Sequence, residues 1–100
     1  GAGVTGTPVT SISHDIGGPT GEYKFEPGEF SFKVGDVVTF TLIAETEFHT
    51  FTVDDLGIDE GIDANSSTTL NYTFDKAGEF KLICIPHELN GMTAVITVVQ

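Results

Sequence analysis

Apolar and polar positions alternate with a period of two along most of this chain. Val38, Phe40 and Leu42 share one face of a predicted strand, and similar alternation recurs in residues 68–74 and 93–99. Because successive side chains of a strand point to opposite faces, this spacing predicts half-buried strands. Patterns with the helical period of 3.6 residues are nearly absent. We therefore expect an all-β chain with almost no helix.

Gly, Pro and Asp separate the short runs of Val, Ile, Thr, Phe and Tyr, and they mark where strands end. A turn is expected at 17–19, and the acidic stretch 54–67 is predicted to be a loop. Seven or eight strands at this spacing are typical of two sheets packed over a common core. The expected fold is a two-sheet Greek-key β-sandwich. Its predicted strands are 8–13, 23–26, 30–33, 37–43, 48–53, 68–74, 80–85 and 93–99.

The length allows one domain, residues 1–100, because 100 residues with 39% hydrophobic content fill a single core. Residues 1–6 are small and mostly apolar or hydroxyl-bearing. We expect them to be disordered, left over from cloning, or downstream of a removed signal or anchor. No run is long and apolar enough to cross a bilayer. The chain is expected to be a monomer.

The charge balance is strongly acidic. Fifteen acids face four lysines, so the net charge is −11. This disfavours a nucleic-acid partner, since binding to phosphates requires clustered Lys or Arg. Nine acids and no lysine lie between Lys33 and Lys76. Two interpretations stay open for this interval: a solvated region that keeps the protein soluble, or a docking surface for a basic partner.

The chemistry-bearing side chains gather in CIPHELNGM, residues 84–92, which holds the only cysteine and the only methionine. Cys84 ends a predicted strand, His87 follows three residues later, and Met92 precedes the last strand. His49 lies on a separate strand. If both loops meet at one end of the sandwich, the Cys and the two His form an N₂S set with a weak axial thioether. That set is expected for a blue-copper electron-transfer centre.

Each of these residues has an ordinary interpretation when taken alone. A single buried Cys is usually a small hydrophobe, and a single Met fills gaps in a core. Their conjunction with two histidines favours copper. Zinc in a Cys-His₂ site would leave Met92 unexplained, and no general base is evident for a catalytic zinc. One cysteine excludes a dinuclear CuA centre within the chain, and the acidic stretch does not match an EF-hand. A Cys-His nucleophile pair fits less well than copper. His14 is interpreted as a surface histidine.

The segment 84–92 resembles the C-x-P-H-x₄-M ligand loop of plastocyanin and the small cupredoxins. Residues 23–42 are similar to the family's strand pair around a Gly-Asp turn. Residues 48–55 are similar to the strand that carries its first histidine, and 74–84 to the turn and strand that lead to its cysteine. The resemblance covers most of the chain. It implies a cupredoxin fold with one copper ion, Cu(I) or Cu(II), per chain.

Carried over residue by residue, the resemblance implies His49, Cys84 and His87 as strong ligands and Met92 as the axial ligand. It implies a type 1 copper protein, not an enzyme, that carries single electrons between larger redox partners such as cytochromes or oxidases. These partners would dock near His87, whose ring edge is exposed within an apolar patch in the family. The expected location is extracytoplasmic: a periplasm, a compartment like the thylakoid lumen, or the outer face of a membrane.

The sequence also departs from the family pattern. Thr50 stands where plastocyanins often have the Asn that ties the two ligand loops together, which predicts a weaker tie. Glu47 and Glu88 lie close to the histidines in sequence, and either would place a carboxylate near the copper. If Met92 swings away, water or an anion takes the axial position.

Two other functions stay open at this level. The first is an open copper site that reacts with a small molecule such as a nitrogen oxide, which azide or nitrite would reveal by changing the Cu(II) spectrum. The second is a copper store or a structural domain of a larger oxidase. Fast, reversible voltammetry would argue against simple storage.

Overall fold

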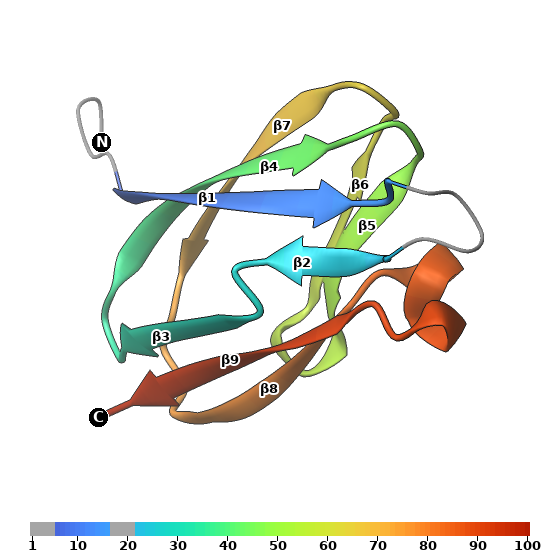
Figure 1. Cartoon of the computed structure of the whole chain (residues 1–100). Helices are drawn as coiled ribbons and strands as arrows, with labels where there is room; N and C mark the ends of the chain where they lie inside the picture. Colours follow the sequence, from blue (N-terminus) through green and yellow to red (C-terminus); the bar gives the residue numbers. More distant parts are fainter. Residues whose placement is uncertain (1–5, 17–21) are drawn as a thin grey trace.

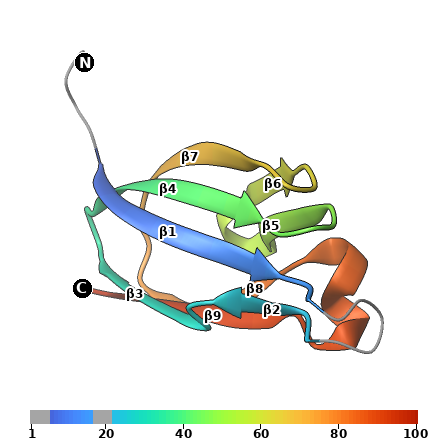
Figure 2. The same cartoon turned by 45° about the horizontal axis from the view of Figure 1, so that its top comes forward.

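Two β-sheets packed face to face form the molecule, as Figures 1 and 2 show for the computed structural model, which describes residues 6–16 and 22–100. The expectations for residues 1–5 and for the turn at 17–19 lie outside the described residues. One sheet has the order β2-β1-β4-β7 and the other β3-β9-β8-β5-β6. The strands are β1 (Thr7–His14), β2 (Lys24–Glu26), β3 (Glu29–Lys33), β4 (Val37–Ala44), β5 (His49–Val53), β6 (Ile58–Ile62), β7 (Ser67–Thr73), β8 (Gly78–Ile83) and β9 (Thr93–Val99).

Both sheets are mixed. β1 pairs in parallel with β4, and β3 pairs in parallel with β9, whereas the other ladders are antiparallel. The chain passes from one sheet to the other five times: between β2 and β3, β3 and β4, β4 and β5, β6 and β7, and β7 and β8. Connections of this kind bring strands distant in sequence to the same end of the sandwich. The predicted all-β sandwich is confirmed, with nine strands in the described residues instead of seven or eight.

The ninth strand is β6, which lies within the stretch predicted to be a loop. It pairs antiparallel with β5 at the edge of its sheet and buries only Ile58 and Ile62. The residues between them are Asp59, Glu60 and Gly61, which are poor strand formers. The sequence pattern therefore did not predict this strand. Hydrogen bonding to β5 outweighs the low strand propensity of these residues. Charged side chains on an edge strand also discourage pairing with another chain.

Phe40 lies at the centre of the core and is fully buried. Its ring centroid is 5.3 Å from that of Phe51 and 6.1 Å from that of Phe30. Phe32 and Phe74 stack on each other at 4.5 Å beside this group. These side chains come from both sheets, so the aromatic cluster fastens one sheet to the other.

Two short 3₁₀ helices connect strands: η2 (Asp54–Leu56) and η3 (Ile85–Asn90). Each ends at a glycine with positive φ, 68° at Gly57 and 85° at Gly91, a conformation that favours glycine. No helix in the described ranges is long and apolar enough to cross a membrane.

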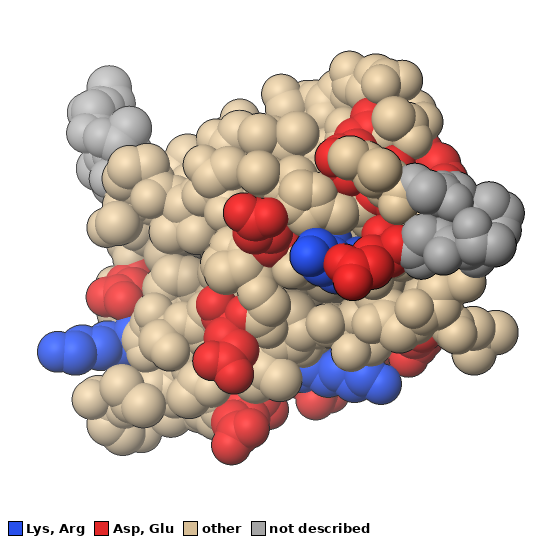
Figure 3. All heavy atoms as spheres, in the orientation of Figure 1, with Lys and Arg blue, Asp and Glu red and all other residues tan. Residues whose placement is uncertain are grey.

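The charged side chains do not gather into one patch on the face drawn in Figure 3, where Asp and Glu occur at several places with Lys between them.

The environment of His14 corrects a prediction. It is half-buried in β1 and is not an ordinary surface histidine. Its Nε2 lies 2.7 Å from Glu26 Oε1 and its Nδ1 lies 3.1 Å from Glu45 Oε1. Two carboxylates from other segments therefore hold the ring.

Candidate metal centre

The predicted ligands converge at one end of the sandwich, where η3 lies in Figures 1 and 2. His49 opens β5, Cys84 follows the end of β8, His87 lies within η3, and Met92 immediately precedes β9. Adjacent strands of one sheet supply most of this frame, since β8 pairs with both β5 and β9. Backbone hydrogen bonds close the loop, because the N–H of Cys84 donates to Met92 O and that of Met92 to His87 O.

His49, Cys84 and His87 form a compact, buried set of metal-ligating atoms, all within 4.8 Å of one another. Cys84 Sγ lies 3.5 Å from His49 Nδ1 and 3.4 Å from His87 Nδ1. Both rings therefore present the same nitrogen to the sulfur. The two imidazole centroids are 4.8 Å apart.

These separations fit a single metal ion. Zinc-type bonds of about 2.3 Å to thiolate and about 2.0 Å to imidazole, at a tetrahedral angle, place sulfur and nitrogen about 3.5 Å apart. The observed distances of 3.4 and 3.5 Å match that value. One thiolate with two imidazoles suits copper in both oxidation states. The donor set and its spacing thus accommodate one copper ion.

Met92 is fully buried, and its backbone pairs with those of Cys84 and His87. A thioether in such a place has no access to bulk water. Its burial disfavours the alternative in which Met92 swings outward and leaves the axial position to solvent.

Thr50 links the two ligand segments. Its backbone N–H donates to Cys84 Sγ at 3.4 Å, and its Oγ1 accepts a hydrogen bond of 2.9 Å from the Ile85 N–H. Thr52 Oγ1 lies 2.9 Å from Thr50 Oγ1 and orients it further. A threonine therefore does make a connection between the loops, in the position where the family often has asparagine.

Burial raises the pKa of the Cys84 thiol, and hydrogen bonds from Thr50 and His87 offset this only partly. Without metal the thiol is therefore protonated at neutral pH. Because the metal ligand is the thiolate, binding requires loss of this proton.

His87 is less exposed than the resemblance implied, with 8% of the residue accessible. Tyr23 stacks on its imidazole, with ring centroids 4.2 Å apart and an interplanar angle of 19°. Glu47 Oε1 lies 3.2 Å from Nε2 and Glu47 Oε2 accepts a hydrogen bond from the Tyr23 hydroxyl. Glu47 therefore lies beside Nε2, the His87 nitrogen that faces away from Cys84. Glu88 instead pairs with Lys81 at 3.3 Å.

Sequence reasoning missed Asp15, whose carboxylate is completely buried beside His49. Asp15 Oδ2 lies 2.7 Å from His49 Nε2 and accepts the Glu47 N–H at 2.9 Å. Thr46 donates its hydroxyl to Oδ1 at 2.6 Å and its N–H to Oδ2 at 3.0 Å. Asp15 precedes His49 by 34 residues, so no local spacing could reveal the contact. An isolated acid directly after a strand was the only available signal.

These hydrogen bonds set the acidity of Asp15. Burial alone would raise its pKa, but the bonds from Thr46, His49 and Glu47 outweigh burial and lower the pKa from 3.8 to about 2. A carboxylate held in this way stabilises the folded state when it is ionised.

This shift predicts a specific acid sensitivity of the metal-free protein. The difference between 3.8 and about 2 corresponds to roughly 2 kcal/mol, present above pH 4 and lost as the pH falls from about 4 to about 2. Urea unfolding of the wild type and Asp15→Asn at successive pH values measures it. We expect their stability difference to shrink across this window. A difference that stays constant from pH 6 to pH 2 would contradict the assignment.

Comparison with known proteins identifies the family of this chain. The family model described as copper-binding proteins of the plastocyanin/azurin family matches residues 12–99. This chain belongs to the plastocyanin/azurin family of copper-binding proteins. It is 30% identical to plastocyanin from Solanum tuberosum in an alignment 95 residues long. The alignment covers 83% of this chain and 95% of that protein.

Solved structures agree on the fold. The chain superposes on oxidised plastocyanin from Dryopteris crassirhizoma with a TM-score of 0.64 at 21% identity, covering 90% of this chain and 99% of that one. Auracyanin B gives a TM-score of 0.72 at 15% identity, with coverage of 97% and 92%. Both likenesses confirm the cupredoxin fold that the ligand-loop resemblance implied.

Family membership and the cluster of His49, Cys84 and His87 together support a type 1 copper electron carrier. The predicted cofactor, one copper ion, is consistent with this cluster. Proteins of the plastocyanin/azurin family carry electrons and are not enzymes, and they exchange these electrons with redox partners.

Proposed function

We propose that this cupredoxin binds one copper ion through His49 Nδ1, Cys84 Sγ and His87 Nδ1, with Met92 as a weak axial ligand. The observation that carries the assignment is the pair of distances from Cys84 Sγ to the two imidazole nitrogens, 3.5 and 3.4 Å. When bound, copper supplies one-electron chemistry by alternating between Cu(I) and Cu(II). The thiolate and imidazoles suit both states, so a change of oxidation state requires little rearrangement.

The protein's own residues keep this site closed. Met92 and His49 are fully buried, and Thr50 fastens the strand that carries His49 to the loop that carries His87. Burial excludes water, which suits electron transfer and disfavours an open site that takes a small-molecule substrate.

The Cu(II) form tests this assignment directly. We expect an intense visible absorption that a mild reductant bleaches, and an EPR spectrum from a single copper with strong thiolate character. Addition of azide or nitrite should leave both spectra unchanged. A colourless Cu(II) complex would refute the ligand assignment, and a spectrum altered by azide would refute the closed site.

We further propose that redox partners of cytochrome or oxidase type dock at the end of the sandwich near His87. Three exposed apolar side chains support this location. In η3, Leu89 is fully exposed and Ile85 is 55% exposed, and Phe48 directly precedes His49. Single exposed apolar side chains are common on protein surfaces, but three beside the candidate ligands favour a docking surface at this end.

Leu89→Ala is expected to slow electron transfer to a c-type cytochrome about tenfold, because it removes an apolar contact at the centre of this surface. Stopped-flow reduction measures the second-order rate constant. Val99→Ala is the matched control, since Val99 is another exposed apolar residue but ends β9 at the opposite end of the molecule. Equal rate constants for the two variants would place the docking surface elsewhere.

The proposed location is extracytoplasmic, since related plastocyanins include chloroplastic proteins from Tetradesmus obliquus and Solanum lycopersicum.

We also propose that the protein is a monomer. A docking surface near His87 suits a carrier that binds its partners one at a time. Sedimentation velocity would contradict this if the copper protein sedimented as a dimer at micromolar concentration.

A further inference from the structure

The buried carboxylate of Asp15 is an unusual neighbour for a candidate copper ligand. Its side chain and that of His49 are both completely inaccessible, and Asp15 Oδ2 lies 2.7 Å from His49 Nε2. Carboxylates are rarely buried, because removing them from water is costly unless they are fully hydrogen-bonded. The hydrogen bonds from Thr46, Glu47 and His49 satisfy this one.

The contact dictates where the imidazole carries its proton. An ionised carboxylate only accepts hydrogen bonds, so Nε2 must be the protonated nitrogen. In the neutral imidazole, which is the form that binds metal, the other nitrogen, Nδ1, then has its lone pair directed at Cys84 Sγ, 3.5 Å away. Asp15 therefore fixes both the tautomer and the orientation of His49.

The same carboxylate holds the segment that leads into His49. Thr46 and Glu47 lie between β4 and β5, and both donate backbone N–H groups to Asp15. Asp15 itself directly follows β1, in the other sheet. One side chain thus joins the end of one sheet to the loop that positions a ligand in the second sheet.

Besides orienting the ring of His49, the carboxylate of Asp15 places a negative charge beside it. Each candidate histidine ligand faces a carboxylate at Nε2, but the side chain of Glu47 is 38% exposed and lies 3.2 Å from His87. Solvent screens Glu47, whereas the negative charge of Asp15 beside His49 is out of contact with solvent. A fixed negative charge next to a ligand stabilises the more positive oxidation state of the metal and makes the imidazole a stronger donor.

We propose that Asp15 is a positioning residue that holds His49 with Nδ1 free for copper and favours Cu(II) over Cu(I). This inference rests on the proposed role of His49 as a ligand. It assigns to this chain a carboxylate-histidine-metal arrangement in which the acid directly follows β1, a strand that supplies no ligand.

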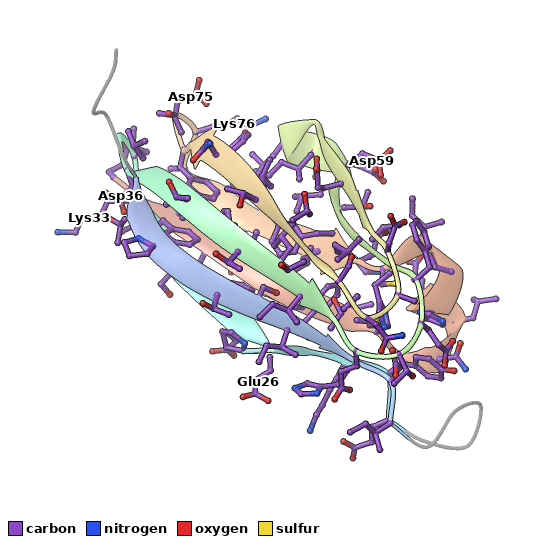
Figure 4. The ribbon with its side chains drawn as sticks, turned by 90° about the horizontal axis from the view of Figure 1, so that it is seen from above. Glu26, Lys33, Asp36, Asp59, Asp75 and Lys76 are labelled. Carbon is purple, nitrogen blue, oxygen red and sulfur yellow. The ribbon has the colours of Figure 1, made fainter. Side chains whose placement is uncertain are left out.

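The decisive variant is Asp15→Asn, which keeps the size of the side chain and one acceptor oxygen but removes the charge. We expect the ratio of Cu(II) to Cu(I) affinity to fall about tenfold, which raises the reduction potential by about 59 mV for a one-electron couple. Asp75→Asn is the matched control. Figure 4 shows Asp75 at the end of the molecule opposite η3, where solvent screens its charge. The affinity ratio of this control should change less than twofold.

A second measurement needs no variant, which matters because Asn places an amide opposite the Thr46 N–H and can prevent folding. ¹⁵N NMR of the metal-free wild type reports which nitrogen of His49 is protonated. We expect a hydrogen-bonded proton on Nε2. A proton on Nδ1 alone would overturn the proposal, as would equal potentials for Asp15→Asn and Asp75→Asn. Because this NMR readout involves no copper, a colourless copper complex would refute the proposed ligand set without deciding the role of Asp15.

Discussion

Cys84→Ser is expected to abolish the intense visible absorption of the Cu(II) protein and to weaken copper binding by at least about a hundredfold. Cys84 Sγ is the one sulfur that faces both imidazole Nδ1 atoms, at 3.5 and 3.4 Å. A serine hydroxyl keeps its proton at neutral pH and is a hard donor, so it replaces neither the charge nor the softness of a thiolate. Absorption spectra and competition titrations with a copper chelator measure the two effects.

Met92→Leu is the informative companion to this variant. It removes the proposed axial thioether but leaves the thiolate and both imidazoles, so we expect a coloured protein with an altered reduction potential. Far-ultraviolet circular dichroism should show that both metal-free variants retain their strands. Retention of the intense band in Cys84→Ser would mean that another group binds copper, and the ligand assignment would be wrong.

Phe40→Ala is expected to destabilise the metal-free protein by about 3–5 kcal/mol, the typical loss for a fully buried Phe. Phe40 lies in β4 of one sheet and contacts aromatic rings of the other, with centroids 5.3 Å from Phe51 and 6.1 Å from Phe30. Small domains are stable by only about 5–15 kcal/mol, so such a loss approaches the whole stability of the fold. Urea unfolding followed by circular dichroism measures it.

Phe48→Ala is the matched control, because Phe48 is 48% exposed and removing it leaves no buried cavity. Its cost should stay below about 1 kcal/mol. Similar losses for the two variants would show that the aromatic cluster does not hold the sheets together. A large loss in Phe40→Ala alone would confirm that the aromatic cluster holds the two sheets together.

Several features were predictable because they depend on neighbours in the sequence. Alternation in residues 37–43 and 93–99 predicted strands whose inward residues are buried, and β4 (Val37–Ala44) and β9 (Thr93–Val99) confirm both within one residue. The segment 84–92 carried the cysteine, one histidine and the methionine in a spacing that left few alternatives to copper. His49 could be added because it opens a separate strand of an all-β chain.

Other features depended on contacts between distant segments. β6 (Ile58–Ile62) forms because β5 offers it hydrogen bonds, although its acids and glycine disfavour a strand. His14 is held by Glu26 and Glu45. Tyr23 stacks on the face of the His87 ring, and Glu47 lies against the Nε2 edge that was expected to be exposed.

The sequence by itself determined the fold class and the candidate copper ligands, because strand periodicity and ligand spacing are local properties of the chain. Only the tertiary structure decided how those ligands are held. It placed Asp15 against His49 across 34 residues and turned Nδ1 of both histidines toward Cys84. The physical reason is that a buried carboxylate needs hydrogen-bond donors, and the packing of the two sheets determines which donors lie beside it. The spacing of residues along the chain does not show this.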